Sequence, residues 1–352
     1  MMASYPLYSS SGEMYWGLLV ALYFFYTGLS AGIMLITSLG GVFALKGLER
    51  VTKVGAVTAV SLLAVAPVHL ILDLEKPLKF ITLIGQFQFR SAMSWGVYIL
   101  ILYALALIFY TYYLFKDNQV NARKFGIASF VLALAVEGYT GFLMGNIQAH
   151  ALWNTPLMPV IFLFSGLTSG TALFLVVYAL LEKLRPAAEP NRYAGITLLA
   201  NWLKWFVLVD GALMVIYFIV LWYGHTDQYA SAYFLLHQDA LSFIWLENVI
   251  GLLIPFLILI YRPWVAKLPA LMLASVLLVF GTLVMRINLV IGGQRLPLFG
   301  DKLVSYSLSS GEVWTALVLA VVAVVLIAVL MKILPHAPVR PITTNHGKEV
   351  VS

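Results

Sequence analysis

The chain has 352 residues, of which 62% are hydrophobic and only 10% carry a formal charge. Soluble domains average roughly 45–50% apolar and about 25% charged residues, so a pair of ordinary soluble domains is excluded. The net charge of +6 is too sparse for a nucleic-acid surface, and we expect the lipid bilayer, not nucleic acid, as the chain's surroundings.

Nine apolar runs follow one another along the sequence, and a membrane-spanning helix takes roughly 20 such residues. No Lys or Arg precedes the first run and no small-residue cleavage site follows it, so we expect a retained span and not a signal peptide. We therefore predict an all-α polytopic membrane protein with about nine transmembrane helices. The runs lie near residues 15–38, 54–72, 93–115, 124–146, 157–181, 203–223, 241–261, 268–288 and 313–334.

The basic residues between the runs predict the orientation. Cytoplasmic loops carry an excess of Lys and Arg, and an outer N-terminus with a cytoplasmic C-terminus places 15 of the 21 basic residues inside. We expect this orientation, in the plasma membrane of a prokaryote. The fifteen are Lys46, Arg50, Lys53, Lys116, Arg123, Lys124, Lys183, Arg185, Arg192, Lys204, Arg262, Lys267, Lys332, Arg340 and Lys348.

The first and fifth runs share a pattern of small residues. Residues 26–32 read YTGLSAG and residues 164–170 read FSGLTSG, and small residues four apart let helices approach closely in lipid. Both runs cross in the same direction, so the match predicts two four-helix bundles in parallel repeat plus one extra C-terminal helix; chance similarity of Gly-rich runs is the alternative. The expected parts are an outer tail (1–14), the first bundle (15–148), the second bundle (149–290), an outer loop with the ninth helix (291–334) and a cytoplasmic tail (335–352).

Three carboxylates fall inside apolar runs, where ionisable groups are costly and mark functional positions. They are Glu137, Asp210 and Glu247. We predict a proton pathway through them; the alternative is a structural role, in which each bonds a basic or amide group across the bundle. Arg286, near the expected outer end of the eighth run, is predicted to reach the headgroups.

His69 and Asp73 lie four residues apart and so share one face of the second run. A histidine beside a carboxylate at a membrane edge suits proton exchange, because its pKa lies near physiological pH. Of the six His, only His69 lies within a run, so we expect no haem and no metal site. The sequence has no cysteine, which excludes a Cys-ligated iron–sulfur cluster, a covalent c-type haem and a disulfide.

Several short strings, in their order and spacing over residues 15–175, resemble the NrfD/PsrC family. These are membrane quinol subunits of polysulfide-, tetrathionate- and nitrite-reductase-type complexes. Ala92 departs from the family, where relatives often have proline. The strings are YTGLSAG (26–32), LDLEKP (72–77), SAMSWG (91–96), YTG (139–141), LWNTPLMP (152–159) and FSG (164–166).

The resemblance implies two stacked four-helix bundles and a bound menaquinone or ubiquinone in the first bundle, near the outer surface. It also implies a ferredoxin-like iron–sulfur subunit docked at the outer face and a molybdopterin-type catalytic subunit beyond it. By position, Tyr139 would hydrogen-bond a quinone carbonyl, and Tyr23 stands where some relatives have His. Asp73 and Glu75 match the acidic stretch near the pocket and would handle protons, while His69 is added from its spacing to Asp73.

Three functions remain in view. The first is a quinol-binding membrane subunit of a respiratory oxidoreductase. The second is a proton- or ion-translocating or proton-coupled transport subunit, although Pro67 and Pro255 do not lie at corresponding positions of the two halves, as broken transporter helices would. The third is an anchor without a site.

Overall fold

The computed structural model describes residues 14, 16–45, 48–74, 85, 87–184, 194–265, 267–296 and 304–333. Within these ranges the chain is helical, and nine helices are long and apolar enough to cross a membrane. The predictions of an all-α fold and of nine spans are confirmed. Glu75 and most of the link between the second and third spans (75–84 and 86) lie outside the described residues.

The nine spans follow one another in the described sequence, and short helices lie in two of the links between them. Helices α8 (Thr226–His237) and α10 (Arg262–Val265) are too short to cross a membrane. The spans are α1 (Leu18–Gly41), α2 (Glu49–Asp73), α4 (Ala92–Phe115), α5 (Gln119–Gly145), α6 (Met158–Leu184), α7 (Ala194–Trp222), η1 (Leu241–Leu253) continued by α9 (Ile254–Ile260), α11 (Leu268–Ile287) continued by η2 (Asn288–Gly292) and α12 (Gly293–Arg295), and α13 (Ser310–Ile333).

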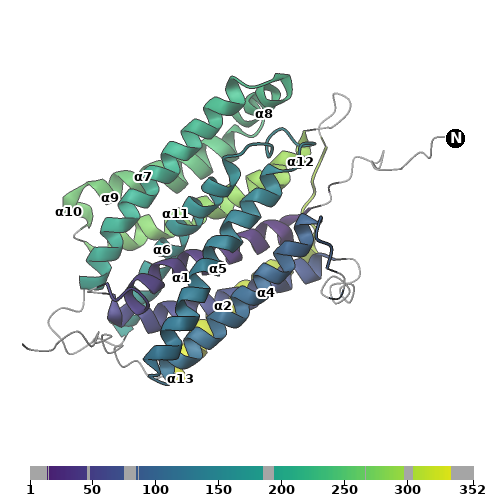
Figure 1. Cartoon of the computed structure of the whole chain (residues 1–352). Helices are drawn as coiled ribbons and strands as arrows, with labels where there is room; N and C mark the ends of the chain where they lie inside the picture. Colours follow the sequence, from purple (N-terminus) through teal and green to yellow (C-terminus); the bar gives the residue numbers. More distant parts are fainter. Residues whose placement is uncertain are drawn as a thin grey trace, which may run out of the picture.

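The long helices run side by side, as Figure 1 shows. Helix α1 packs on α2 and α5, and α4 packs on α5, while α6, α7, η1 and α11 contact one another in a second group. Helices α1 and α5 also contact α6, and α13 lies against α2. The division of the sequence after residue 148 and the parallel repeat stay predictions.

Small residues bring α1 and α6 into close contact. A Cβ atom added to Gly32 would overlap the carbonyl oxygen of Gly166, and one added to Gly170 would lie 2.8 Å from the Cα of Gly32. The two similar strings of the sequence therefore meet each other at this crossing. The prediction that these seams allow close helix approach is confirmed.

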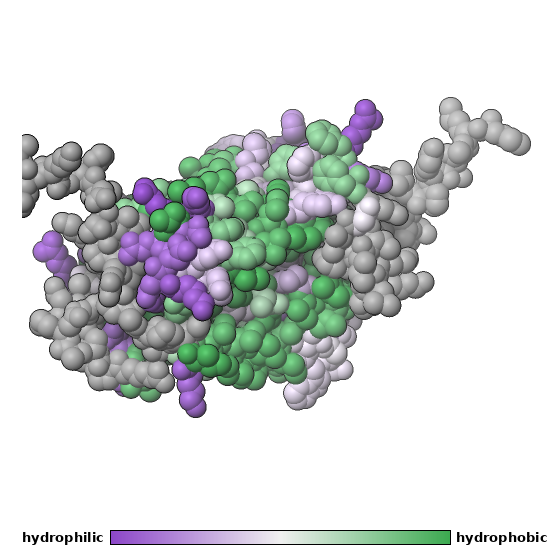
Figure 2. Space-filling model, turned by 60° about the horizontal axis from the view of Figure 1, so that its bottom comes forward, coloured by the Kyte–Doolittle hydropathy of each residue, from purple (hydrophilic) through white to green (hydrophobic). Residues whose placement is uncertain are grey.

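The outer surface suits a bilayer. Figure 2 shows a broad hydrophobic area across the middle of one face, with hydrophilic residues gathered toward one end. Helix α13 has only 11% of its most apolar window buried, and its Val side chains, Trp314 and Leu317 are exposed. Such a helix is stable only in apolar surroundings.

Two segments are π-helical where the sequence predicted ordinary α-helix, namely η1 and η2. In each, a side-chain nitrogen donates to a main-chain carbonyl: Asn248 Nδ2 bonds Phe243 O at 2.7 Å, and Trp153 Nε1 bonds Leu289 O at 2.6 Å. Pro255 has no N–H to donate, and the backbone returns to α-helix at this point. π-helical turns often mark functional positions.

Candidate functional site

Tyr139 of α5 and Gly96 of α4 lie in direct contact. Helix α4 begins at Ala92 because the hydroxyl of Ser91 caps it, accepting from Ser94 N at 3.4 Å. Gly96 follows one turn later, and a Cβ there would overlap the Tyr139 ring and its hydroxyl. The structure thus joins two strings of the sequence, SAMSWG and YTG, at one place.

Tyr23 of α1 lies near the same place. It is within electrostatic range of both Tyr139 and Glu137, and its side chain is buried. The residues predicted to hold a quinone and the first residue of the predicted proton pathway are therefore neighbours. Whether these residues hold a quinone stays a prediction.

His69 is fully buried and held in a defined orientation. Its ring stacks on Tyr26, with 4.9 Å between centroids and 21° between planes. Its Nδ1 lies 3.1 Å from the carbonyl oxygen of Val65, which can only accept, so Nδ1 carries the proton. Nε2 is then left with a free lone pair, and it has no partner among the described residues.

Asp73 does not pair with His69, although they share a helix face. Asp73 ends α2 and interacts with Glu312 and Tyr306 near the start of α13. The Tyr306 hydroxyl donates to Glu312 at 2.7 Å and accepts from Leu18 N at 2.9 Å. Burial, reinforced by the two carboxylates, raises the pKa of Tyr306 and keeps it a donor.

This cluster of Asp73, Tyr306 and Glu312 was missed because its members lie far apart in the sequence. Glu312 caps α13 together with Ser309: Ser309 N donates to Glu312 Oε2 at 3.0 Å, and Glu312 N donates to Ser309 Oγ at 3.1 Å. The spacing S-x-x-E before an apolar run was the available signal. The capped end of α13 thereby contacts the start of α1.

Arg286 corrects the sequence prediction. It was expected to reach the headgroups, but α11 continues through η2 and α12 to Arg295, so Arg286 lies inside the span with 0% of its surface exposed. Its Nη2 donates to Ser165 Oγ at 2.8 Å and lies 4.0 Å from Glu137 Oε2. The guanidinium also lies 3.7 Å from the centroid of the Phe162 ring.

Arg286 connects the first two predicted proton-pathway residues. Its charge interacts with both Glu137 and Asp210, which come from helices of the two packing groups. Gly166 makes room for the Glu137 side chain, because a Cβ there would lie 2.8 Å from Glu137 Oε2. One buried cation therefore lies between two buried carboxylates.

The third carboxylate, Glu247, belongs to the π-helical segments. Asn288 Nδ2 donates to Glu247 Oε2 at 2.7 Å, and Ser242 Oγ donates to Asn288 Oδ1 at 2.5 Å. The amide partner that the structural alternative required for Glu247 is thus present. These hydrogen bonds join the two π-helical segments, η1 and η2.

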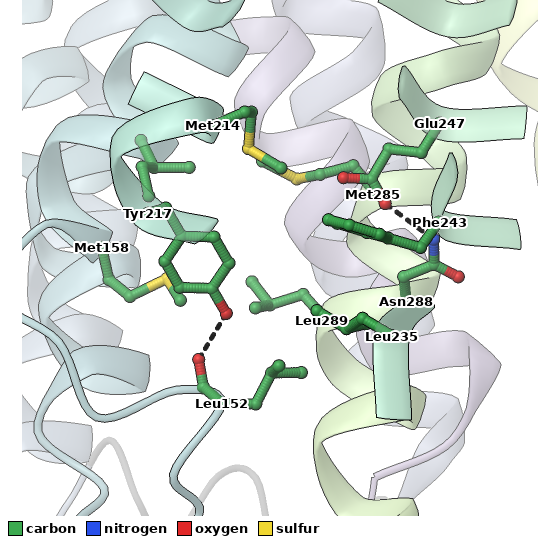
Figure 3. A pocket seen from close by; sticks show the side chains of 11 residues that line it. Leu152, Met158, Met214, Tyr217, Leu235, Phe243, Glu247, Met285, Asn288 and Leu289 are labelled. Carbon is green, nitrogen blue, oxygen red and sulfur yellow. Dashed lines mark hydrogen bonds between the residues drawn. The ribbon is translucent and has the colours of Figure 1, made fainter. Parts of the chain in front are cut away.

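Two small cavities adjoin Glu247. One, of about 30 Å³, is shown in Figure 3 with Tyr217 on one side and Glu247 and Asn288 on the other. The second, of about 20 Å³, is lined by Ser165, Asp210 and Glu247. A polar cavity of roughly 10–15 Å³ or more holds a water molecule, so both have room for water.

Several buried polar atoms of this network have no hydrogen-bond partner among the described residues. They include Glu137 Oε2, Asp210 Oδ1, and Nε and Nη1 of Arg286. Buried polar atoms are nearly always bonded to protein or ordered water. The network therefore has sites for water or for an added proton next to each charged group.

The string LWNTPLMP forms the link between α5 and α6 and the first residues of α6, and it contacts α7 and the chain just before α1. Trp153 stacks on Trp16, with 5.4 Å between centroids, and Tyr217 Oη donates to Leu152 O at 2.6 Å. His150 packs on Trp153, and burial lowers its pKa. Among the described residues no group of three or more His, Asp or Glu could hold a metal ion.

These features define a multi-pass helical membrane protein with a network of ionisable groups buried between its helices. A family model described as "Polysulphide reductase, NrfD" matches residues 7–298. The chain belongs to this family, which confirms the resemblance seen in the sequence.

Three relatives illustrate the family. A selenate reductase subunit of Mesobacillus selenatarsenatis is 26% identical, with the match covering 81% of this protein and 75% of the relative. A polysulfide reductase subunit of Wolinella succinogenes is 28% identical, with 79% and 94% covered respectively. The Hdr-like menaquinol oxidoreductase integral membrane subunit of Archaeoglobus fulgidus is 24% identical, with 85% and 75% covered. The family relation supports a membrane subunit of a respiratory oxidoreductase.

Proposed function

We propose that this chain is the quinol-binding membrane subunit of a respiratory oxidoreductase and exchanges electrons between a quinol and a docked iron–sulfur subunit. The named relatives include reductase subunits and a menaquinol oxidoreductase membrane subunit. The observation that carries the proposal to this protein is the orphaned Nε2 of His69, whose ring stacks on Tyr26 of α1, the helix that also carries the quinone-site candidate Tyr23.

The residues present fit a quinone. A quinone ring needs a donor to its carbonyl oxygen, and a quinol hydroxyl needs an acceptor. Tyr139 offers a half-buried phenol, and His69 Nε2 offers a lone pair in a ring held by Val65 and Tyr26. The quinol, when bound, supplies two electrons and two protons; Asp73, and Glu75 by its place in the sequence, would exchange those protons with the outer side.

The electrons require a partner subunit. The sequence has no cysteine, so any iron–sulfur cluster that receives them must be held by another subunit. We place that ferredoxin-like subunit at the outer face, with a molybdopterin-type catalytic subunit beyond it, in a prokaryotic plasma membrane with the N-terminus outside. The same site serves quinol oxidation and quinone reduction.

Quinol binding by the assembled complex tests this proposal. We expect Tyr139→Phe and His69→Gln each to weaken binding of a fluorescent quinol analogue by about tenfold, as for loss of one hydrogen bond of roughly 1.4 kcal/mol. Asp73→Asn should slow quinol-linked turnover. Tyr110→Phe is the matched control, because the Tyr110 hydroxyl is buried but has no partner among the described residues.

Unchanged binding in Tyr139→Phe and His69→Gln would contradict this assignment of residues. Absence of any saturable binding by the complex would instead favour an anchor without a site. Tyr110→Phe removes a buried hydroxyl from the same group of helices. If this variant binds the quinol analogue normally, a loss of binding in Tyr139→Phe is due to its position and not to a general effect of removing a tyrosine hydroxyl.

The buried network favours a second function, transfer of protons through the membrane span. Glu137, Arg286 and Asp210 follow one another, and water-sized cavities continue to Glu247. A carboxyl group next to a water molecule can exchange a proton with it, so carboxyl groups that alternate with water can carry protons through the span. Glu137→Gln should then reduce proton uptake by proteoliposomes while quinol binding survives; full proton transfer in this variant would exclude the route.

A further inference from the structure

A large pocket lies far from the residues discussed so far, between the start of α7 and the turn that joins α9 to α11. Its volume is about 620 Å³, which falls in the usual range of ligand sites, roughly 300–1,000 Å³. The pocket opens where two spans begin or end. Its lining residues are Ile196, Thr197, Ala200, Asn201, Lys204, Leu259, Ile260, Arg262, Val265, Leu268 and Leu271.

Among the described residues that line the pocket, the charged ones are both cationic. They are Lys204 and Arg262. The Lys204 ammonium lies 5.5 Å from the centroid of the Trp205 ring, and within the described part of the chain neither cation forms a salt bridge. Two cations without a carboxylate favour an anionic ligand.

Apart from Thr197 and Asn201, the rest of the described lining is apolar, and the pocket lies at the level of a membrane boundary. Its floor consists of buried aliphatic side chains, including Ile196, Leu259 and Leu271. Tyr261 and Trp264, next to Arg262, are exposed; such rings are typical of the interface between headgroups and acyl chains. The ligand therefore meets cations at the rim and hydrocarbon below them.

We propose that this pocket binds an anionic phospholipid. Lys204 and Arg262 would bind its phosphate, with Asn201 as a neutral donor beside them, and the acyl chains would lie along the aliphatic floor. Basic pockets between transmembrane helices bind such headgroups. A free phosphate ion would use the rim but gain nothing from the floor, so the combination selects a lipid.

Native mass spectrometry can count the lipids bound to the purified full-length protein. We titrate phosphatidylglycerol and phosphatidylcholine with identical acyl chains. Phosphatidylglycerol should bind more tightly, and the double variant Lys204→Gln/Arg262→Gln should weaken it roughly 30-fold, at about fivefold per cation. Phosphatidylcholine binding should not change.

A matched control separates the pocket from general surface charge. Arg123→Gln/Lys124→Gln removes two exposed cations near the start of α5 and should leave phosphatidylglycerol binding unchanged. Ala200→Leu, which extends into the floor and keeps both cations, should weaken both lipids. Inorganic phosphate at millimolar concentration should not displace phosphatidylglycerol.

Three results would overturn the proposal. An equal loss of phosphatidylglycerol affinity in the two double variants would mean that the lipid is attracted non-specifically by surface charge. Displacement by inorganic phosphate would identify a soluble anion as the ligand. Equal affinity for the two lipids would show that the cations do not select a charged headgroup. Melting temperatures of all variants confirm that they fold.

Discussion

The pair formed by Arg286 and Glu137 gives the sharpest test of the buried network. Arg286→Met removes the cation that lies between two carboxylates, and Glu137→Gln removes one of those carboxylates while keeping its shape. We expect each single variant to be destabilised, and the double variant to lose less than the sum of the two. The difference is the coupling free energy of the pair.

The geometry sets the size of this coupling. The charged atoms are 4.0 Å apart, and two unit charges at that distance attract by about 4 kcal/mol at an effective dielectric constant of 20. Removing one partner of a buried pair typically costs about 3–5 kcal/mol. Ser165 and Asp210 remain as partial partners of Arg286, so we expect a coupling of about 2–3 kcal/mol.

Reversible unfolding in mixed micelles, titrated with a denaturing detergent, measures these free energies. The protein supplies its own control in Lys53 and Asp117, whose charged atoms are 3.4 Å apart but whose aspartate is 73% exposed. Water screens that pair, and its coupling should be below about 1 kcal/mol. A buried-pair coupling no larger than this control would show that the network does not hold the helices together.

Four further predictions follow from local contacts. Gly96→Ala should push the Tyr139 ring aside and weaken binding of the quinol analogue about tenfold, for loss of one hydrogen bond. Gly32→Ala should overpack the α1–α6 crossing and cost roughly 1–3 kcal/mol in the same unfolding titration. Ser309→Ala should remove the cap of α13 and cost about 1 kcal/mol. Burial lowers the pKa of His150, so the unfolded state binds the proton more readily and stability should fall as pH drops through about 6.5; His150→Gln should flatten that pH dependence.

One substitution serves as the control for both glycine variants. Gly138 lies on α5, beside Tyr139, and a Cβ added there meets nothing within 4 Å. Gly138→Ala should therefore leave stability and quinol binding unchanged or slightly improved. If Gly96→Ala and Gly32→Ala behave like Gly138→Ala, the close contacts do not matter for function or stability.

The order of the spans was predictable because crossing a bilayer requires an unbroken apolar run, a property of local sequence. The same is true of the glycine strings near residues 28–32 and 166–170, since close helix packing in lipid requires small residues at regular spacing. The carboxylates Glu137, Asp210 and Glu247 were recognisable for a similar reason: each is the single acidic residue of its apolar run.

What those residues contact was decided by the tertiary structure. Arg286 became a buried partner of Glu137 because α11 extends through a π-helical segment to Arg295; the apolar residues 289–291 were the available sign of that extension. Asp73 interacts electrostatically with Glu312, near the start of α13 and more than 200 positions away, and does not pair with His69 on its own helix.

Sequence by itself thus determined the membrane class, the number of spans and the candidate ionisable residues, because hydropathy and charge act locally along the polypeptide. Only the packing of distant helices decided which ionisable groups meet, where two small cavities lie beside Glu247, and how a cationic pocket forms between α7 and α11. Those features depend on helix rotation and on departures from regular α-helix, which arise when side chains such as Asn248 and Trp153 bond to main-chain carbonyls.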